Sequence, residues 1–126
     1  MFSLPPVFRY CSLLAASSVA LSGCHVGGPS AIRPSPLLPF AQCISQRGVV
    51  LYGADWCPHC QQQKLMFGSA ISAVAYVECP QDPQRCLKAG IAGYPTWVLP
   101  DGSKLEGTQP LEDLAAATGC QLPQQP

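Results

Sequence analysis

Two cysteines separated by two residues, Cys57 and Cys60, lie where an apolar run meets a helix-forming segment. The run before them, VVLYGA at residues 49–54, is continuous and contains β-branched residues, as a buried central strand does. The segment from Cys57 to Ile71 is read as a helix, because Pro58 suits the first turn. The pattern therefore predicts a strand that delivers the cysteine pair to the N-terminus of a helix.

Four kinds of chemistry are open to such a pair. Zinc would require two more ligands at close spacing, but Cys79 and Cys86 have six residues between them. His59, inside the pair, is badly placed to share a metal with both sulfurs, so no metal is expected. Covalent haem requires a histidine after the second cysteine, where the chain has Gln61. A purely structural disulfide would close a very short loop and contribute little stability.

A redox role explains more of the pattern. At the start of a helix, the Cys57 thiolate would be stabilised by unpaired backbone N–H groups and by the helix dipole. This lowers the pKa of the thiol, and the thiolate is the reactive species. Cys60 lies one turn later on the same face and can resolve a mixed disulfide. We expect Cys57 to be the more exposed attacking thiol and Cys60 the more buried one, and their disulfide to serve without any other cofactor.

Hydrophobic patterning and turn residues predict an α/β domain beyond this pair. We expect Leu65 and Met66 on the second helix to face the core. Asp82 is a candidate N-cap for a later helix, and Asp101 with Gly102 predicts a tight turn between two strands. The remaining elements are expected as a helix over 40–48, a strand over 73–79, a helix over 82–90, strands over 95–100 and 103–107, and a helix over 111–119.

The N-terminus predicts export. One cation and no acid precede a short apolar segment, which is shorter than the roughly 20 residues that span a bilayer. LSGC at residues 21–24 resembles a bacterial lipobox, which implies that Cys24 is lipidated and becomes the first residue. We expect a signal peptide over 1–23, a Pro/Gly-rich tether over 24–39, the domain over 40–122 and a tail over 123–126. An ordinary secretory signal and an uncleaved anchor remain the alternatives.

The cysteine content supports an oxidising compartment, since eight cysteines in 126 residues is unusual for a protein of reducing cytosol. Cys43 and Cys120 bracket the domain, and Cys79 and Cys86 bracket the loop and helix after the second strand. We expect pairs 43–120 and 79–86, both structural. Loop-closure entropy gives them about 4–5 and about 2 kcal/mol, respectively. The alternative is that Cys79 and Cys86 form a second redox pair that relays electrons.

WCPHC after a strand, followed by GYPT some way along the chain, resembles the thioredoxin superfamily. The resemblance implies a thioredoxin-like fold, with a central mixed four-stranded sheet flanked by helices. It implies that Pro95 is a cis-proline packed against the active pair. The backbone of Tyr94 would pair with substrate chains, and Trp56 and Thr96 would complete the substrate-binding residues.

A narrower resemblance covers roughly residues 42–120. There the chain is similar to the thioredoxin-like domain attached to bacterial and cyanobacterial vitamin K epoxide reductase homologues, here expected as a stand-alone lipoprotein. The resemblance implies a membrane partner of that type. The buried acid of thioredoxin's central strand aligns with Leu51, so no general base is expected at that position. Glu78 is the nearest alternative by position, although a surface acid at a strand end is the simpler reading.

The residues between the two cysteines bear on the direction of electron flow. Pro58 and His59 match the dipeptide of a periplasmic thiol oxidase, and a histidine in the first helical turn can stabilise the Cys57 thiolate. A more stable thiolate makes the disulfide a stronger oxidant. The sequence thus favours oxidation or isomerisation of disulfides over net reduction.

The expected function is that of an exported, membrane-tethered thiol-disulfide oxidoreductase acting on exported client proteins. It would face the periplasm, or the thylakoid lumen in a cyanobacterium, and act as a monomer. Seven basic and seven acidic residues give no charge excess that would suggest nucleic acid as a partner. The alternatives are a periplasmic thiol reductase, for example in cytochrome maturation, and a redox-inert binding module with the same fold.

Overall fold

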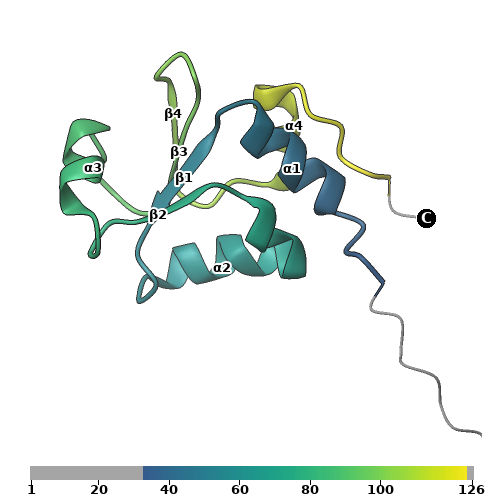
Figure 1. Ribbon diagram of the computed structural model, residues 1–126, viewed down its shortest axis with the longest axis horizontal. Helices are drawn as coiled ribbons and strands as arrows, with labels where there is room; N and C mark the ends of the chain where they lie inside the picture. The colour runs from purple at the N-terminus through teal and green to yellow at the C-terminus, as the bar shows by residue number, and fades with distance from the viewer. Residues whose placement is uncertain (1–32, 125–126) are drawn as a thin grey trace, which may run out of the picture. The chain divides into compact units, whose positions relative to one another are not determined.

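The computed structural model describes residues 33–124 (Figure 1). Helices and strands follow one another in the predicted order, α-β-α-β-α-β-β-α. One predicted helix is shorter than expected: it ends at Phe67 and continues as a 3₁₀ helix, because Gly68 adopts a φ of 55° that ends the α-helix. The elements are α1 (Leu38–Gln46), β1 (Val50–Gly53), α2 (Pro58–Phe67), η1 (Gly68–Ala73), β2 (Tyr76–Glu78), α3 (Pro83–Lys88), β3 (Thr96–Val98), β4 (Lys104–Glu106) and α4 (Leu111–Thr118).

The four strands form one mixed sheet in the order β2-β1-β3-β4. β1 runs parallel to β2 and antiparallel to β3, and β3 and β4 form an antiparallel pair. Leu51 in β1 lies opposite Tyr76 on one side and Trp97 on the other, so these three residues share a face of the sheet. The predicted α/β fold with a mixed four-stranded sheet flanked by helices is confirmed.

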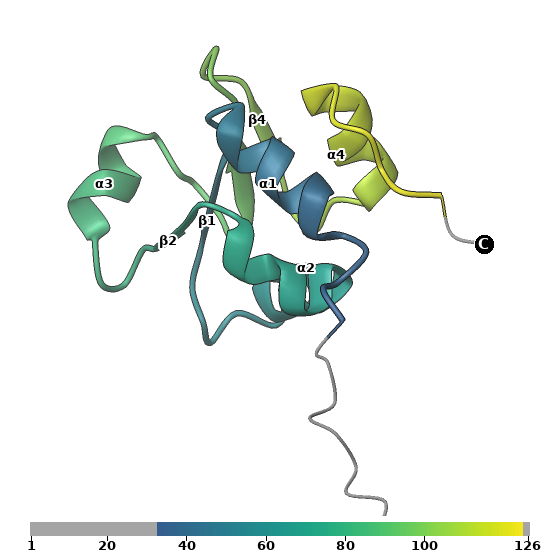
Figure 2. The same ribbon diagram turned by 45° about the vertical axis from the view of Figure 1, so that its right-hand side comes forward.

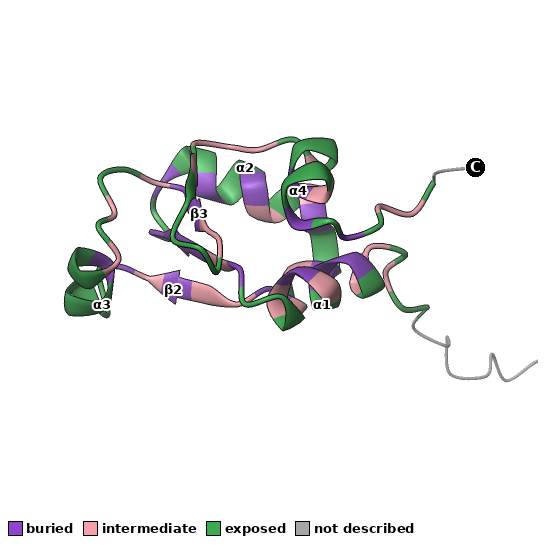
Figure 3. Cartoon of the chain, turned by 90° about the horizontal axis from the view of Figure 1, so that it is seen from above, coloured by how far each residue is buried: buried purple, intermediate pink, exposed green. Residues whose placement is uncertain are grey.

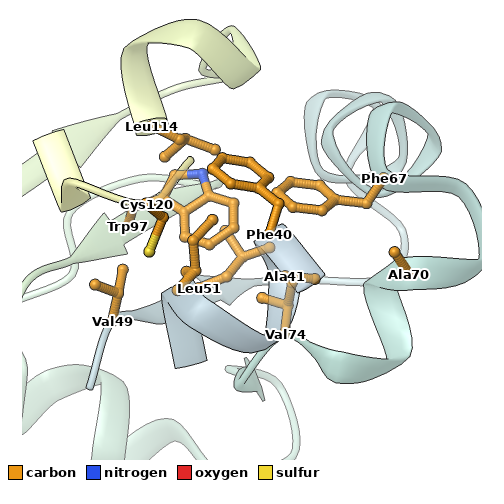
Figure 4. Close-up of a cluster of buried hydrophobic side chains, with 11 residues drawn as sticks. Phe40, Ala41, Val49, Leu51, Phe67, Ala70, Val74, Trp97, Leu114 and Cys120 are labelled. Carbon is orange, nitrogen blue, oxygen red and sulfur yellow. The ribbon is translucent and has the colours of Figure 1, made fainter. Parts of the chain in front are cut away.

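The main core lies on this face of the sheet. Leu51 and Trp97 are fully buried against side chains of α1, α2 and α4 (Figure 4). The rings of Phe40 and Phe67 stack with their centroids 6.0 Å apart, and Phe67 lies 5.8 Å from Trp97. These aromatic contacts fix α2 on the sheet and thereby fix the helix that begins beside Cys57.

A smaller cluster covers the opposite face. Tyr52 and Val77 pack there with Cys79 and Cys86, next to α3. The two ribbon views agree that α3 lies on one side of the strands and that α1 and α4 lie on the other (Figures 1 and 2). Cys86 is the only buried residue within α3, and the other residues of this helix are exposed (Figure 3). The contact between α3 and the sheet is therefore small.

Two disulfides cross-link the domain, one over a long stretch of the chain and one locally. Cys43 in α1 is bonded to Cys120 just after α4, across 77 residues of sequence, with the Cα atoms 5.9 Å apart. Cys79 at the end of β2 is bonded to Cys86 in α3, with the Cα atoms 5.7 Å apart. Cys57 and Cys60 are free thiols.

The expected core face of α2 is wrong at Leu65, which is 79% exposed. The inward positions of this helix are Cys60, Gln63 and Phe67, which are separated by three and four residues and so share one face. Leu65 falls on the opposite face. Met66, the other residue expected to face the core, is half-buried, and a cysteine and a glutamine occupy fully buried positions on the inward face.

Between residues 33 and 124, no helix combines the length and the apolar character that a membrane span requires. The predicted signal peptide, lipidation site Cys24 and most of the tether fall on residues 1–32, outside the described part of the chain. The first helix begins at Leu38 and includes Pro39 in its first turn.

Candidate active site

The cysteine pair lies at the junction between β1 and α2. The strand ends at Gly53, and a turn follows in which the Cys57 N–H donates to the Ala54 carbonyl at 3.0 Å. Cys57 has an extended backbone at the N-cap of α2, and Pro58 occupies the first turn, where its missing N–H costs no helical hydrogen bond. The junction therefore places the Cys57 sulfur at the N-terminus of the helix.

The two thiols lie in different environments. Cys57 is 7% exposed, whereas Cys60 is fully buried. The backbone N–H of Cys60 lowers the pKa of Cys57 below its ordinary value of 9.0, with smaller contributions from the Cys60 thiol and the His59 backbone N–H, while burial opposes them. Burial, and to a smaller extent the neighbouring Cys57, raise the pKa of Cys60 to about 11. Cys57 is thus the group suited to attack, and Cys60 is the protected partner.

The Tyr94–Pro95 turn packs beside the pair. The peptide bond between these residues is cis, and the carbonyl of Tyr94 accepts a hydrogen bond from the Cys57 thiol at 3.7 Å. Pro95 and Thr96 are buried, and the Thr96 hydroxyl donates to the Gly93 carbonyl at 2.8 Å. The Thr96 side chain therefore faces inward and holds this turn, while the backbone of Tyr94 lies at the reactive sulfur.

Exposed side chains surround Cys57. Trp56 is 68% exposed and contacts the ring of Tyr94 edge-on, with the centroids 6.1 Å apart. His59 is also exposed, and its backbone carbonyl accepts a hydrogen bond from the Thr108 hydroxyl at 3.2 Å. The structure connects His59 to Cys57 through the backbone N–H. These residues form an accessible surface at which an extended chain could meet the sulfur.

The Cys60 side chain packs against the end of β1 in the sheet. A side chain at Gly53 would place its Cβ only 2.7 Å from the Cys60 sulfur and 3.3 Å from the Tyr76 hydroxyl. Tyr76 in turn donates a hydrogen bond to the Glu78 carboxylate at 2.6 Å. Leu51, where thioredoxin carries its buried acid, is fully buried in the apolar core.

The polar groups over Tyr76 come from α2 and from the turn before it. The Lys64 ammonium lies 3.8 Å from the centroid of the Tyr76 ring and forms an ion pair with Asp55. The backbone N–H of Asp55 donates to the second oxygen of Glu78 at 3.0 Å. Sequence reasoning missed Tyr76, because its approach to Cys60 depends on the pairing of β1 with β2.

Gln63 was also missed. It is fully buried, and its side-chain oxygen accepts hydrogen bonds from the Trp97 indole at 3.2 Å and from the Gln109 backbone N–H at 2.6 Å. Its amide group donates to the Gln109 carbonyl at 3.1 Å. One side chain therefore ties α2 to β3 and to the segment before α4. The spacing from Cys60 to Gln63 and Phe67 was the available signal.

In the described part of the chain, no three His, Cys, Asp or Glu residues are grouped closely enough to hold a metal ion. The chemistry available to the site is thiol-disulfide exchange. The exposed edge of Cys57 would form a bond to a second sulfur, and Cys60 would break it.

Comparison with known proteins agrees with this geometry. The sequence model of the thioredoxin family matches residues 39–118. A thiol-disulfide oxidoreductase of Arabidopsis thaliana, LTO1, is 38% identical over 96 residues, which cover 69% of this chain and 25% of that protein. A probable protein disulfide-isomerase A6 of Medicago sativa is 38% identical over 81 residues, 53% of this chain and 22% of that protein. The chain thus spans about a quarter of the length of these curated relatives.

Two solved structures resemble the chain at lower identity. Oxidised mitochondrial thioredoxin 3 from Saccharomyces cerevisiae has a TM-score of 0.43 and 24% identity, and the match covers 64% of this chain and 85% of that one. The first thioredoxin domain of mouse protein disulfide-isomerase A4 has a TM-score of 0.42 and 22% identity, and the match covers 64% and 67% of the two chains.

Proposed function

The chain belongs to the thioredoxin family, and from that premise we propose that it is an exported, membrane-tethered thiol-disulfide oxidoreductase that oxidises or isomerises disulfides in exported proteins. The observation that carries the proposal is the asymmetry of the two thiols. Cys57 is partly accessible and has a lowered pKa, whereas Cys60 is fully buried and its pKa is raised. The names of the two plant relatives, an oxidoreductase and a probable isomerase, support the same class of reaction.

In the oxidising direction, a client thiolate attacks the Cys57 sulfur of the Cys57–Cys60 disulfide. The S–S bond breaks, its electron pair leaves on Cys60, and the client becomes bonded to Cys57. A second client thiolate then attacks the client sulfur of this mixed disulfide and releases Cys57 as a thiolate. The client gains a disulfide, and the pair gains two electrons and is left reduced.

The thiolate at Cys57 favours this direction. Because backbone N–H groups stabilise it, they stabilise the reduced state and make the disulfide a stronger oxidant. The backbone of Tyr94 beside the sulfur would align the client, and Trp56 would contact the client's side chains.

Trapping tests the proposed mechanism. In Cys60→Ser, the Cys57 thiolate can attack the disulfide of an oxidised client, but no second active-site thiol can break the resulting bond, so mixed disulfides with exported proteins should accumulate and disappear on reduction. Cys57→Ser is the matched control and should trap none. The proposal would be contradicted by a Cys60→Ser variant that captures no client although its Cys57 still reacts with iodoacetamide.

The reduction potential distinguishes oxidation from reduction. Equilibration with glutathione should give a potential above that of thioredoxin, which is about −270 mV. The protein should also reoxidise a reduced, unfolded client faster than it reduces insulin. A potential at or below that of thioredoxin would instead favour the thiol reductase, and activity in neither assay would favour a redox-inert module.

The proposal includes attachment to a membrane through a lipid on Cys24, based on the LSGC sequence at residues 21–24. Expression in a bacterial host with a labelled fatty acid should label the wild type and leave Cys24→Ser unlabelled. Cell fractionation should move the variant from the membrane to the soluble exported fraction. Label that persists in Cys24→Ser would remove this part of the proposal.

We further propose that a membrane protein of the vitamin K epoxide reductase type reoxidises the Cys57–Cys60 pair. The narrower resemblance over residues 42–120 supports this partner. Membranes that contain such a protein should reoxidise the reduced domain, and membranes with its cysteines replaced should not. Equal rates with both membranes would exclude this partner.

A further inference from the structure

Each cycle of the proposed function requires Cys60 to lose a proton. When the pair is reoxidised, Cys57 first becomes bonded to the oxidant, and Cys60 then attacks the Cys57 sulfur to close the disulfide. Only a thiolate attacks efficiently. Cys60 is fully buried, and its pKa is about 11, so bulk water neither reaches the thiol nor readily accepts its proton. A base inside the protein would remove this obstacle.

The Tyr76 hydroxyl is the polar side-chain group that the sheet places beside Cys60. The Cys60 sulfur lies 2.7 Å, and the Tyr76 oxygen 3.3 Å, from the same point above Gly53. The two atoms are therefore at most 6.0 Å apart, and because the Tyr76 hydroxyl donates its hydrogen bond to Glu78, the transfer requires the Cys60 thiol to turn toward the Tyr76 oxygen. Their approach depends on the missing side chain at Gly53, since a Cβ there would clash with the sulfur and fill the space between them.

Glu78 completes the path to solvent. It accepts the Tyr76 hydroxyl hydrogen bond at 2.6 Å, lies two residues further along β2 on the same face, and is half-buried. Every ionisable neighbour of Tyr76 is accounted for: Lys64 and Cys60 from α2, Asp55 from the turn before it, and Glu78 from its own strand. Lys64 is paired with Asp55, whose carboxylate also faces Tyr76, and the hydroxyl itself donates its hydrogen bond to Glu78.

We infer that Tyr76 and Glu78 form a proton relay that accepts the proton of Cys60 when this thiol closes the active-site disulfide. The inference rests on the proposed function. It assigns the acceptance of the Cys60 proton to two residues of β2, because Leu51, at the position of thioredoxin's buried acid, has no group that can accept a proton. Tyr76 is the group beside the reacting sulfur, and Glu78 acts through Tyr76.

The Cys60 S–H proton passes to the Tyr76 oxygen as the Tyr76 proton passes to a Glu78 oxygen. The Cys60 sulfur then forms a bond to Cys57, the bond between Cys57 and the oxidant's sulfur breaks, and its electron pair leaves on that sulfur. The two protein thiols lose two electrons to the oxidant, and Glu78 returns its proton to water.

An aromatic disulfide, dithiobis(nitrobenzoate), separates the two chemical steps. Mixed with the reduced protein in a stopped-flow instrument, it releases one coloured thiolate when Cys57 attacks and a second when Cys60 closes the disulfide. The two phases should be recorded across the pH range for the wild type, Tyr76→Phe and Glu78→Gln. Tyr76→Phe keeps the ring under Lys64, and Glu78→Gln keeps an acceptor oxygen for the Asp55 N–H.

In both variants, the second phase should slow by about tenfold or more near neutral pH, while the first phase is unchanged. The rate of the second phase should then rise steeply with pH and approach the wild-type rate at strongly alkaline pH, where Cys60 ionises without help. If Tyr76 and Glu78 had only a structural role, their substitution would lower the stability of the protein but would leave the pH profile of the second phase unchanged.

Two matched controls remove similar groups elsewhere. Tyr52→Phe deletes a hydroxyl on the opposite face of the neighbouring strand, and Glu106→Gln neutralises an exposed acid on β4. Both should retain the wild-type profile. Thermal unfolding of each variant would show that the comparison is made between folded proteins.

The inference is overturned if the wild-type profile persists in Tyr76→Phe and Glu78→Gln. It is also overturned if Tyr76→Phe alone changes the second phase, because the hydroxyl would then act without the carboxylate. Failure of the proposed function has a different signature: the wild type itself would trap and oxidise no client, whatever the profile of its reaction with the aromatic disulfide.

Discussion

At the scale of single residues, Gly53 is the point at which β1 contacts the buried active-site thiol of Cys60. Gly53 is the last residue of β1, and its φ is not in the left-handed region. This position therefore requires glycine because there is no space for a side chain, and not because of its backbone conformation. The Cys60 sulfur occupies the volume that a Cβ would fill. This close approach brings the buried thiol against the sheet, next to the side chain of Tyr76.

Gly53→Ala should disturb Cys60. The new Cβ would lie 2.7 Å from the sulfur, which must move to relieve the clash. We expect a loss of about 1–3 kcal/mol in the free energy of unfolding of the reduced protein, measured by urea denaturation, because overpacking a core costs this amount. Closure of the disulfide should also slow. Gly93→Ala, where a Cβ would meet no atom within 4 Å, is the control.

The two thiols should titrate separately. The lowered pKa of Cys57 predicts that its alkylation by iodoacetamide reaches half its maximal rate below pH 9.0, whereas Cys60 should ionise near pH 11. Cys57 stabilises the reduced fold above its unfolded pKa and loses that contribution as pH falls through its folded pKa, whereas the Cys60 contribution is lost as pH rises through about 11. An alkylation midpoint above 9.0 for Cys57 would contradict this assignment.

At the scale of elements, α2 is held in place by polar contacts as well as by its core residues. Gln63 bonds to Trp97 and Gln109, and Thr108 bonds to the backbone carbonyl of His59. The segment before α4 therefore helps to fix the first two turns of α2. The helix that presents Cys57 is thus held both by apolar packing and by these hydrogen bonds.

Gln63→Ala should destabilise the fold by about 3 kcal/mol. It leaves a buried indole N–H and two backbone groups of Gln109 without partners, and each unsatisfied buried group costs roughly 1–3 kcal/mol. Urea unfolding monitored by tryptophan fluorescence would measure the loss. Gln62→Ala, at the exposed neighbouring position, should change stability by less than about 0.5 kcal/mol.

The element order followed from sequence because periodicity and turn residues are local signals. The Asp82 N-cap is an example, since its side chain accepts from the Arg85 N–H as expected. The inward face of α2 could not be predicted from the sequence. The rotation of this helix is set by the packing of Cys60 against Gly53, the last residue of β1, whereas hydrophobicity favours Leu65 as the inward residue. Tyr76 could not be predicted as a site residue either, because its position beside Cys60 depends on the pairing of two strands that are far apart in sequence.

At the scale of the whole molecule, the Cys43–Cys120 disulfide encloses nearly all of the folded domain. It joins α1 to the end of α4, across the main core that both helices cover. A small domain buries a limited apolar surface, so a covalent link of this span contributes a large share of its net stability. The Cys79–Cys86 bond acts locally and holds α3, whose own contact with the sheet is small.

The two disulfides should differ in their effect on stability. Replacing Cys43 and Cys120 together by serine should lower the free energy of unfolding by about 4–5 kcal/mol, and replacing Cys79 and Cys86 by about 2 kcal/mol, because the entropy of closing a loop grows with its length. Denaturation with Cys57 and Cys60 held reduced would measure both. Equal losses, or a larger loss for the shorter loop, would show that chain entropy does not set the order.

The two structural disulfides also make the protein dependent on the type of reaction that it is proposed to catalyse. A newly made chain can form its Cys43–Cys120 and Cys79–Cys86 bonds only by passing four electrons to an oxidant. Each copy therefore begins as a client of the disulfide supply before it can contribute to that supply. A cell that starts without any active copies needs a second oxidant to mature the first ones, and loss of oxidising capacity would stop the production of the catalyst together with that of its clients.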